Sequence, residues 1–234
     1  MVKYKFALCN LTLLPIAYPK TLQQMANLVE AQTQRQTGRS FGGQLQTAIE
    51  SMNEMSCWCY FGDDHGRGRG PVMDEIDQIC KTLADGYDCA MIDHEEELRR
   101  NSNDDCVPWD VDYRSAVGGT SEQLTEACNR LNRNKCAARA CIVEGNFISS
   151  LTLHFISGGS VNMDYKHENG FDHVSQCVGK AGVPADEKRC CGKYPMRFPY
   201  KPMGGERDCC GIKTYNTFAL ECCDAGTGLV RASC

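Results

Sequence analysis

The cysteines are the residues of this chain whose number and spacing point most directly to a chemistry. Seventeen of the 234 residues are cysteines, and ten of them lie between Cys136 and Cys234. A reducing compartment keeps thiols unpaired and oxidisable, whereas an oxidising compartment joins them into disulfides. So many thiols suit the second setting, and the sequence therefore predicts a secreted, extracellular protein.

The N-terminal segment accounts for the odd cysteine, since an odd number leaves at least one thiol without a partner in the chain. Lys3 and Lys5 precede a short apolar run that closes at Ala17, which is the layout of a secretory signal. Cleavage of residues 1–18 removes Cys9 and leaves sixteen cysteines, enough for eight bridges. The alternative is a buried strand or helix at this place, and Cys9 is then a candidate for a bridge between subunits.

Three doublets of adjacent cysteines mark the C-terminal segment: Cys190-Cys191, Cys209-Cys210 and Cys222-Cys223. Adjacent cysteines rarely bond to each other because the resulting ring is strained, so each doublet should tie down two other points of the chain. Zinc is the rival explanation, but the C-x-x-C pairs of zinc sites are missing and the setting is oxidising. We predict that residues 177–234 form a small module of turns and short strands held by its own bridges.

The residues after each doublet extend this pattern. Gly192 and Tyr194 follow the first doublet, and Gly211 and Tyr215 follow the second. This spacing resembles the di-cysteine repeats of galaxin-type extracellular matrix proteins, over the chain from Cys190 onwards. The resemblance implies a structural role outside cells.

A second group of residues with chemical potential begins at Cys57 and Cys59. A Gly-rich loop leads from them to Pro71, and a run of acids and cysteines follows. The order Asp74, Asp77, Cys80, Asp85, Cys89 resembles the first catalytic helix of secreted phospholipase A2, and the preceding loop resembles the calcium loop of that family.

The resemblance continues at Cys141-Ile142-Val143-Glu144, which is similar to the Cys-Asp segment of the second helix in that family. It implies a phospholipase A2-like antiparallel helix pair, with Cys59 bonded to Cys80 and Cys89 bonded to Cys141. The cysteines that we expect in bridges are Cys59, Cys80, Cys89, Cys141, Cys190, Cys191, Cys209, Cys210, Cys222 and Cys223.

The resemblance breaks at the catalytic residue. The family uses a histidine as general base, next to an aspartate that holds calcium against the ester. No histidine lies between Cys80 and Cys89; Ala84 stands near the expected place and Asp85 follows it. Loss of one positioned base typically costs about two to four orders of magnitude in rate. We therefore predict no catalytic residue and no enzyme activity, and we assign His94, in the acidic run beyond Cys89, no catalytic role.

Calcium is the one cofactor that the resemblance leaves open. Backbone carbonyls at Tyr60 and Gly62 and the carboxylate of Asp85 offer the oxygen ligands that this ion prefers. The alternative is that these acids and loop residues are ordinary turn and cap residues.

Helical periodicity indicates the elements that position these residues. In residues 19–56, a Gln-rich arm, apolar stripes predict two helices that either pack in the core or serve as a propeptide or docking arm. Asp74–Asp85 predicts a helix that ends at Gly86. Thr120 with Gln123 predicts a capping box at the start of the next helix. Cys136–Ser157 predicts a long apolar helix, central to the fold.

An extended strip rich in proline and aromatic residues separates the first two doublets. Tyr194, Arg197, Phe198 and Tyr200 are its interface candidates, and packing of the strip against its own module is an equal alternative. The net charge of −5 argues against a nucleic-acid partner. Beyond the N-terminus, no apolar run reaches the length of a membrane span.

These observations predict a mainly α, disulfide-rich protein, with a phospholipase A2-like helical domain over residues 57–176 and a small irregular, cystine-knotted module over residues 177–234. The function that we expect is that of a non-enzymatic secreted structural protein, which assembles with copies of itself or other matrix proteins into a fibre, coat or matrix. The alternatives are a secreted calcium-dependent lipid hydrolase and a lipid- or protein-binding module on the same scaffold.

Overall fold

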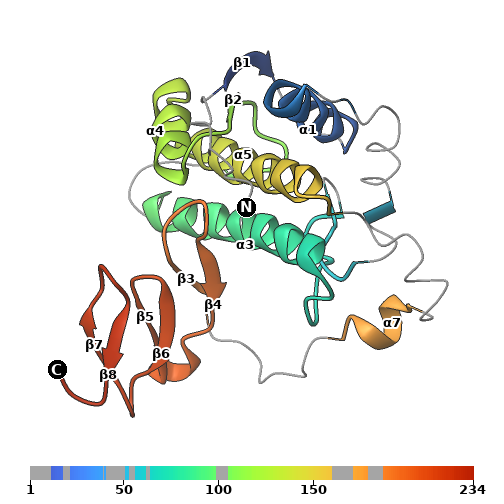
Figure 1. Ribbon diagram of the computed structural model, residues 1–234. Coiled ribbons are helices and arrows are strands. Elements are labelled where there is room, and N and C mark those ends of the chain that lie inside the picture. The colour runs from blue at the N-terminus through green and yellow to red at the C-terminus, as the bar shows by residue number, and fades with distance from the viewer. Residues whose placement is uncertain are drawn as a thin grey trace, which may run out of the picture.

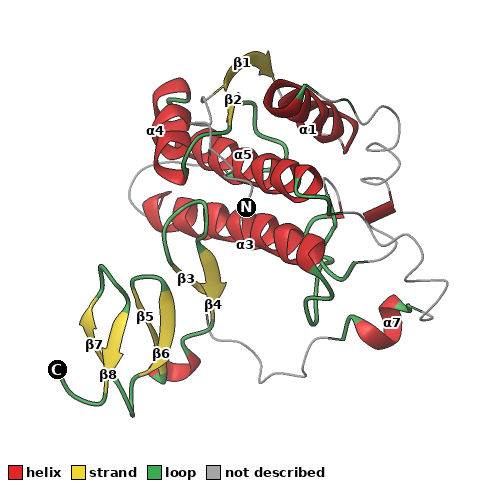
Figure 2. Ribbon diagram, viewed as in Figure 1, coloured by secondary structure: helices red, strands yellow, loops and turns green. Residues whose placement is uncertain are grey.

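A computed structural model describes residues 12–17, 22–38, 40, 51–52, 56–61, 64–98, 105–159, 171–178 and 187–234. The described part is mainly helical and rich in disulfides, with a set of short hairpins at its C-terminal end (Figures 1 and 2). Its helices are α1 (Leu22–Thr37), α3 (Glu75–Leu98), α4 (Ser121–Leu131), α5 (Lys135–Ile156) and the single turn α7 (His173–Gln176).

Helices α3 and α5 lie side by side and run antiparallel at the centre of the helical body (Figure 1). The C-terminal end of α3 meets the start of α5, where Glu97 pairs with Arg139 at 2.7 Å. At the other end, His154 of α5 contacts Glu75 of α3 at 3.1 Å. The two central helices therefore form an antiparallel pair, and its likeness to the phospholipase A2 pair stays a prediction.

Helix α3 continues well past Gly86, so the prediction that this glycine ends the helix was wrong. Gly86 lies where α3 contacts Val143 of α5. A Cβ atom at this position would stand 2.6 Å from Cγ1 of Val143. The glycine therefore permits a close helix contact and does not terminate the helix.

The predicted start of α4 is confirmed, and the predicted span of α5 is confirmed to within one residue at each end. The hydroxyl of Thr120 accepts from the backbone of Gln123, whose side chain accepts from the backbone of Thr120 in return. Helix α5 is buried over most of its circumference, as expected for a central element. Residue Gly158, with φ +88°, follows its end.

Helix α1 packs its predicted apolar face into the main core. Met25, Ala26 and Val29 are buried together with the side chains of α3 and α5. Of the second predicted helix of the arm, Met52 is helical and fully buried. Most of that second stretch lies outside the described residues.

Residues 12–17, which we predicted to lie in a cleaved signal, form strand β1 (Thr12–Ala17). This strand pairs antiparallel with β2 (Arg114–Val117), with Leu13 opposite Ala116. The arrangement corresponds to the alternative of a folded strand, and cleavage stays a prediction. Cys9 lies outside the described residues.

The tail, defined here as residues 187–234, contains three antiparallel hairpins, where the composition predicted only turns and short strands. They are β3 (Arg189–Cys191) with β4 (Phe198–Tyr200), β5 (Arg207–Cys210) with β6 (Lys213–Asn216), and β7 (Glu221–Asp224) with β8 (Leu229–Arg231). A short 3-10 turn, η2 (Met203–Gly205), joins the first hairpin to the second. The first hairpin contacts α3, and the other two project away from the helical body (Figure 1).

Candidate functional site

The carboxylate of Glu144 is the buried acid of the helix pair. Glu144 lies on α5 with 1% of its surface exposed. The hydroxyl of Tyr87 on α3 donates to Oε1 at 2.7 Å, and the hydroxyl of Tyr113 donates to Oε2. Both oxygens of this acid, which lies in the segment similar to the family's Cys-Asp segment, thus accept hydrogen bonds from tyrosines.

The two tyrosines act as donors because their hydroxyls keep their protons. Burial, and then the charge of Glu144, raise the pKa of both Tyr87 and Tyr113 well above the ordinary value. The trio joins α3, α5 and the segment before β2 through one buried carboxylate. Because both phenols stay protonated and donate to Glu144, the trio is a structural hydrogen-bond network and offers no general base.

At the place where the resemblance puts the base, α3 carries no proton acceptor. Ala84 is half-buried, and the next residue, Asp85, is paired with Lys81 one turn earlier on the same helix. The pKa of Asp85 is raised above its ordinary value, because the effect of burial exceeds the opposing effect of the Lys81 ammonium.

The structure describes two of the three residues assigned to calcium, Tyr60 and Asp85. The carboxylate of Asp85 is occupied by Lys81. Tyr60 is half-buried in the loop, and Gly62 lies outside the described residues. Within the described ranges, no group of three or more His, Cys, Asp or Glu side chains is placed to hold a metal.

A histidine that the sequence did not single out lies beside this region. The side chain of His65 is only 4% exposed, and its Nε2 stands 3.3 Å from Oδ1 of Asp88 on α3. Its ring packs against Trp109 at 4.4 Å and Tyr87 at 5.1 Å between centroids. Because these residues belong to separate segments, no local spacing identifies the cluster.

Asp88 also joins this cluster to the tail. Lys188 binds its second carboxylate oxygen at 3.1 Å. Burial alone raises the pKa of Asp88, but the hydrogen bond from His65 and the charge of Lys188 outweigh burial, so its pKa is lowered.

The loop before α3 is fastened to the helix by an acid and a disulfide. The carboxylate of Asp77, which is fully buried, accepts from the backbone of Trp58 at 2.7 Å and of Met73 at 2.9 Å. Cys59 is bonded to Cys80, the pair that the resemblance implies.

The implied bond between Cys89 and Cys141 is wrong. Cys89 is bonded to Cys190 in the tail, and Cys141 is bonded to Cys128 on α4. The reason is helical geometry. Tyr87 faces α5, and Cys89 lies two positions later, more than half a turn around the helix, so it points away from α5.

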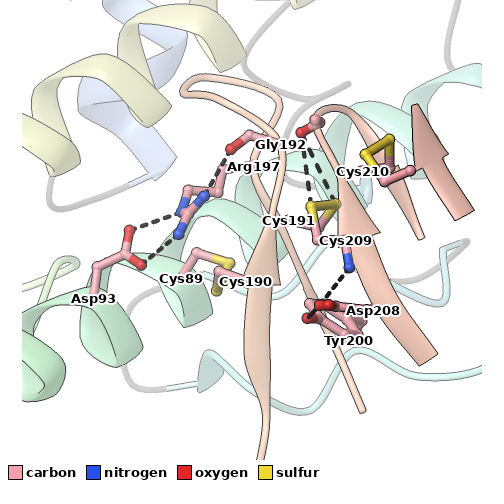
Figure 3. The surroundings of a disulfide bond; sticks show 12 residues. Cys89, Asp93, Cys190, Cys191, Gly192, Arg197, Tyr200, Asp208, Cys209 and Cys210 are labelled. Atoms are coloured by element: carbon pink, nitrogen blue, oxygen red, sulfur yellow. Dashed lines mark hydrogen bonds and ion pairs between the residues drawn. A yellow bond between two sulfur atoms is a disulfide. The ribbon is translucent and has the colours of Figure 1, made fainter. Parts of the chain in front are cut away.

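The remaining bonds form a continuous ladder through the tail. Each doublet cysteine bonds to a different point of the chain, as the strain argument predicted, and Figure 3 shows the first of these junctions. We define the cystine ladder as the bonds Cys89–Cys190, Cys191–Cys209, Cys210–Cys222 and Cys223–Cys234. With Cys57–Cys177, Cys59–Cys80, Cys106–Cys136 and Cys128–Cys141, eight bridges use all sixteen cysteines of the described residues.

Ionic contacts hold the first hairpin against α3 beside the first rung of the ladder. Asp93 lies one helical turn after Cys89, and both of its oxygens accept from Arg197, through Nε and Nη2 at 2.8 Å each (Figure 3). The hydroxyl of Tyr194 donates to the same carboxylate at 2.9 Å. Arg197 also donates to the carbonyl of Gly192 at 2.7 Å.

The four interface candidates of the strip therefore lie against their own chain. Tyr194 and Arg197 bind Asp93, Phe198 is half-buried, and Tyr200 is buried with its hydroxyl 3.0 Å from Asp208. Tyr200 packs within its own module, as the alternative predicted, whereas Tyr194 and Arg197 contact α3 outside that module.

The fold and these sites define a mainly helical, disulfide-rich protein with an antiparallel helix pair and a cystine-linked tail. Comparisons with protein-family models, curated proteins and solved structures found no match to the chain. Among the described helices, none is long and apolar enough to cross a membrane.

Proposed function

We propose that this protein is a non-enzymatic, secreted structural protein that assembles with itself into an extracellular fibre, coat or matrix. The observation that carries the proposal is the cystine ladder, which joins three hairpins in series to the helical body. Each bridge typically stabilises a fold by about 2–4 kcal/mol. A chain with eight of them suits a material that must persist outside cells.

The contacts of the helix pair favour a role as a scaffold over a role in catalysis. In this proposal it is a phospholipase A2-like pair that has lost its base, since Ala84 cannot accept a proton. The acid at Glu144 is engaged by Tyr87 and Tyr113. These bonds stabilise the helix contact without a histidine.

The alternative is a secreted lipid hydrolase, and one contact favours it. His65 with Asp88 is the kind of histidine–carboxylate pair that serves as a general base. Against this role, the His65 side chain is almost fully buried between Trp109 and Tyr87. A substrate would have to displace those rings before it reached the imidazole.

Two measurements on the purified, oxidised protein test the proposal. Light scattering and electron microscopy under non-reducing conditions should show concentration-dependent assembly into extended particles. Fatty-acid release from phospholipid vesicles, with and without calcium, should stay at the background rate. Protein that remains monomeric at every concentration, or release that disappears in His65→Ala, would refute the structural function.

A further inference from the structure

We infer that the last rung of the cystine ladder, Cys223–Cys234, is an exchange site at which the thiol of another molecule becomes covalently attached to this chain. The incoming sulfur bonds to Cys234, and Cys223 is released as a free thiol. The inference goes beyond the proposed function and does not depend on self-assembly.

The last rung differs from the other bridges in its access to solvent. Among the cysteines that the structure describes, Cys234 is the only exposed one, and its partner Cys223 is half-buried. Each of the other seven bridges has at least one fully buried cysteine. A thiolate must reach a sulfur atom to open a disulfide, so access is one of the factors that set the rate.

The backbone around Cys234 also leaves room for an approaching sulfur. The other cysteines of the tail that are not fully buried lie in strands, with Cys190 in β3, Cys209 in β5, and Cys222 and Cys223 in β7. Cys234 follows the end of β8 and belongs to no strand. The neighbouring strand of a hairpin therefore does not cover it.

The fold of the tail should survive the opening of this bond. Strand β8 pairs with β7 through Arg231 opposite Glu221 and Val230 opposite Cys222. Cys210–Cys222 separately fastens the third hairpin to the second. Opening of the last rung releases residues 232–234, where the backbone N–H of Cys234 donates to Glu221 at 3.3 Å. The inner rungs, in contrast, each join a hairpin to another hairpin or to α3.

The chemical step balances without an oxidant or a reductant. The attacking thiol gives its proton to water, and its thiolate forms a bond to Sγ of Cys234. The bond between the two Sγ atoms of Cys223 and Cys234 breaks, and the electron pair stays on Cys223, which takes up a proton. One disulfide replaces another. The ligand class is therefore a thiol, carried by a small molecule or by a cysteine of another polypeptide.

Brief exposure of the oxidised, folded protein to reduced glutathione tests the inference. The reaction is stopped with acid, free thiols are labelled with N-ethylmaleimide, and peptides are mapped without reduction. Glutathione should appear on Cys234 and maleimide on Cys223. Because access limits the attack, this bridge should open about tenfold faster than any other.

A peptide with a single cysteine, used in place of glutathione, distinguishes the two sources of the thiol. Coupling of the peptide to Cys234 shows that another polypeptide can occupy the site. Coupling of glutathione alone assigns the site to small thiols.

Two controls identify access as the cause. The same reaction in concentrated guanidinium makes every bridge accessible, so the preference for Cys234 should disappear. The double variant Cys223→Ser with Cys234→Ser should keep the other seven bridges in the peptide map and lose the early reaction with glutathione. The mapping of the original chain decides the result if that variant does not fold.

Three outcomes would overturn the inference. In the folded protein, another bridge reacts first or glutathione spreads evenly over the bridges. The preference for Cys234 persists undiminished in guanidinium. Glutathione appears on Cys223 and leaves Cys234 as the free thiol. None of these depends on assembly, so a protein that stays monomeric but exchanges at Cys234 refutes the proposed function alone.

Discussion

The hydroxyl of Tyr87 on α3 lies 2.7 Å from the carboxylate of Glu144 on α5, across 57 positions of sequence. This contact lies next to the close approach of Gly86 and Val143 on the same two helices. The buried acid therefore joins the two helices through a hydrogen bond.

Replacement of Tyr87 by Phe should destabilise the fold, because one oxygen of a buried carboxylate then loses its donor. An unsatisfied buried partner typically costs about 1–3 kcal/mol. Guanidinium unfolding with the disulfides intact measures the loss. Tyr215→Phe is the control, since the Tyr215 hydroxyl makes no hydrogen bond within the described part. Equal stability of the two variants would show that the Glu144 contact contributes nothing.

A methyl group at Gly86 should also destabilise the fold, although alanine is the better helix former by about 1 kcal/mol. The added carbon would lie 2.6 Å from Val143, and overpacking of this kind costs about 1–3 kcal/mol. Val143→Ala makes room for it. The double variant should therefore be more stable than the sum of the two single changes predicts, and simple additivity would argue against the contact.

Lysine at position 197 should loosen the first hairpin although it keeps the charge. The guanidinium of Arg197 makes two parallel bonds to Asp93 and a third to Gly192, and an ammonium lacks that planar geometry. Hydrogen bonds to charged groups contribute about 1.5–3 kcal/mol each. Hydrogen exchange of the β3 and β4 amides should accelerate in Arg197→Lys and stay unchanged in Lys201→Gln, where the side chain is exposed.

The stabilising effect of Asp88 should depend on pH in one direction. Its pKa in the folded protein lies below the ordinary value of 3.8, so its contribution is present above that value. It is lost as the pH falls through the lowered pKa and the carboxylate takes up a proton. The free energy of unfolding of Asp88→Asn should therefore be lower than that of the original chain at neutral pH. The gap should narrow below pH 3.8, and a gap that widens in acid would contradict the assignment.

Features encoded by neighbouring residues could be predicted from the sequence. The capping box at Thr120 and Gln123, the span of α5 and the buried face of α1 each depend on side chains within a few turns. The separate partners of each doublet also follow from a local cause, the strain of a bond between adjacent cysteines.

Features that depend on a distant partner could not be predicted. A glycine inside a helix and a glycine at its end have the same local signature, and only Val143 distinguishes the two at Gly86. The partner of Cys89 depends on which face of α3 meets the tail. The cluster of His65, Asp88 and Trp109 draws on three segments, so no motif contains it.

The cystine ladder also determines how the tail bears tension. Between Cys89 and Cys234, the shortest covalent route passes through sulfur atoms and the single peptide unit inside each doublet. The hairpin segments between the bonded cysteines lie outside this route, so they carry no tension. Under a force applied at Cys234, the oxidised tail should therefore extend very little. Chemical reduction of the bridges would let the hairpin segments unfold, and the same tail would become highly extensible.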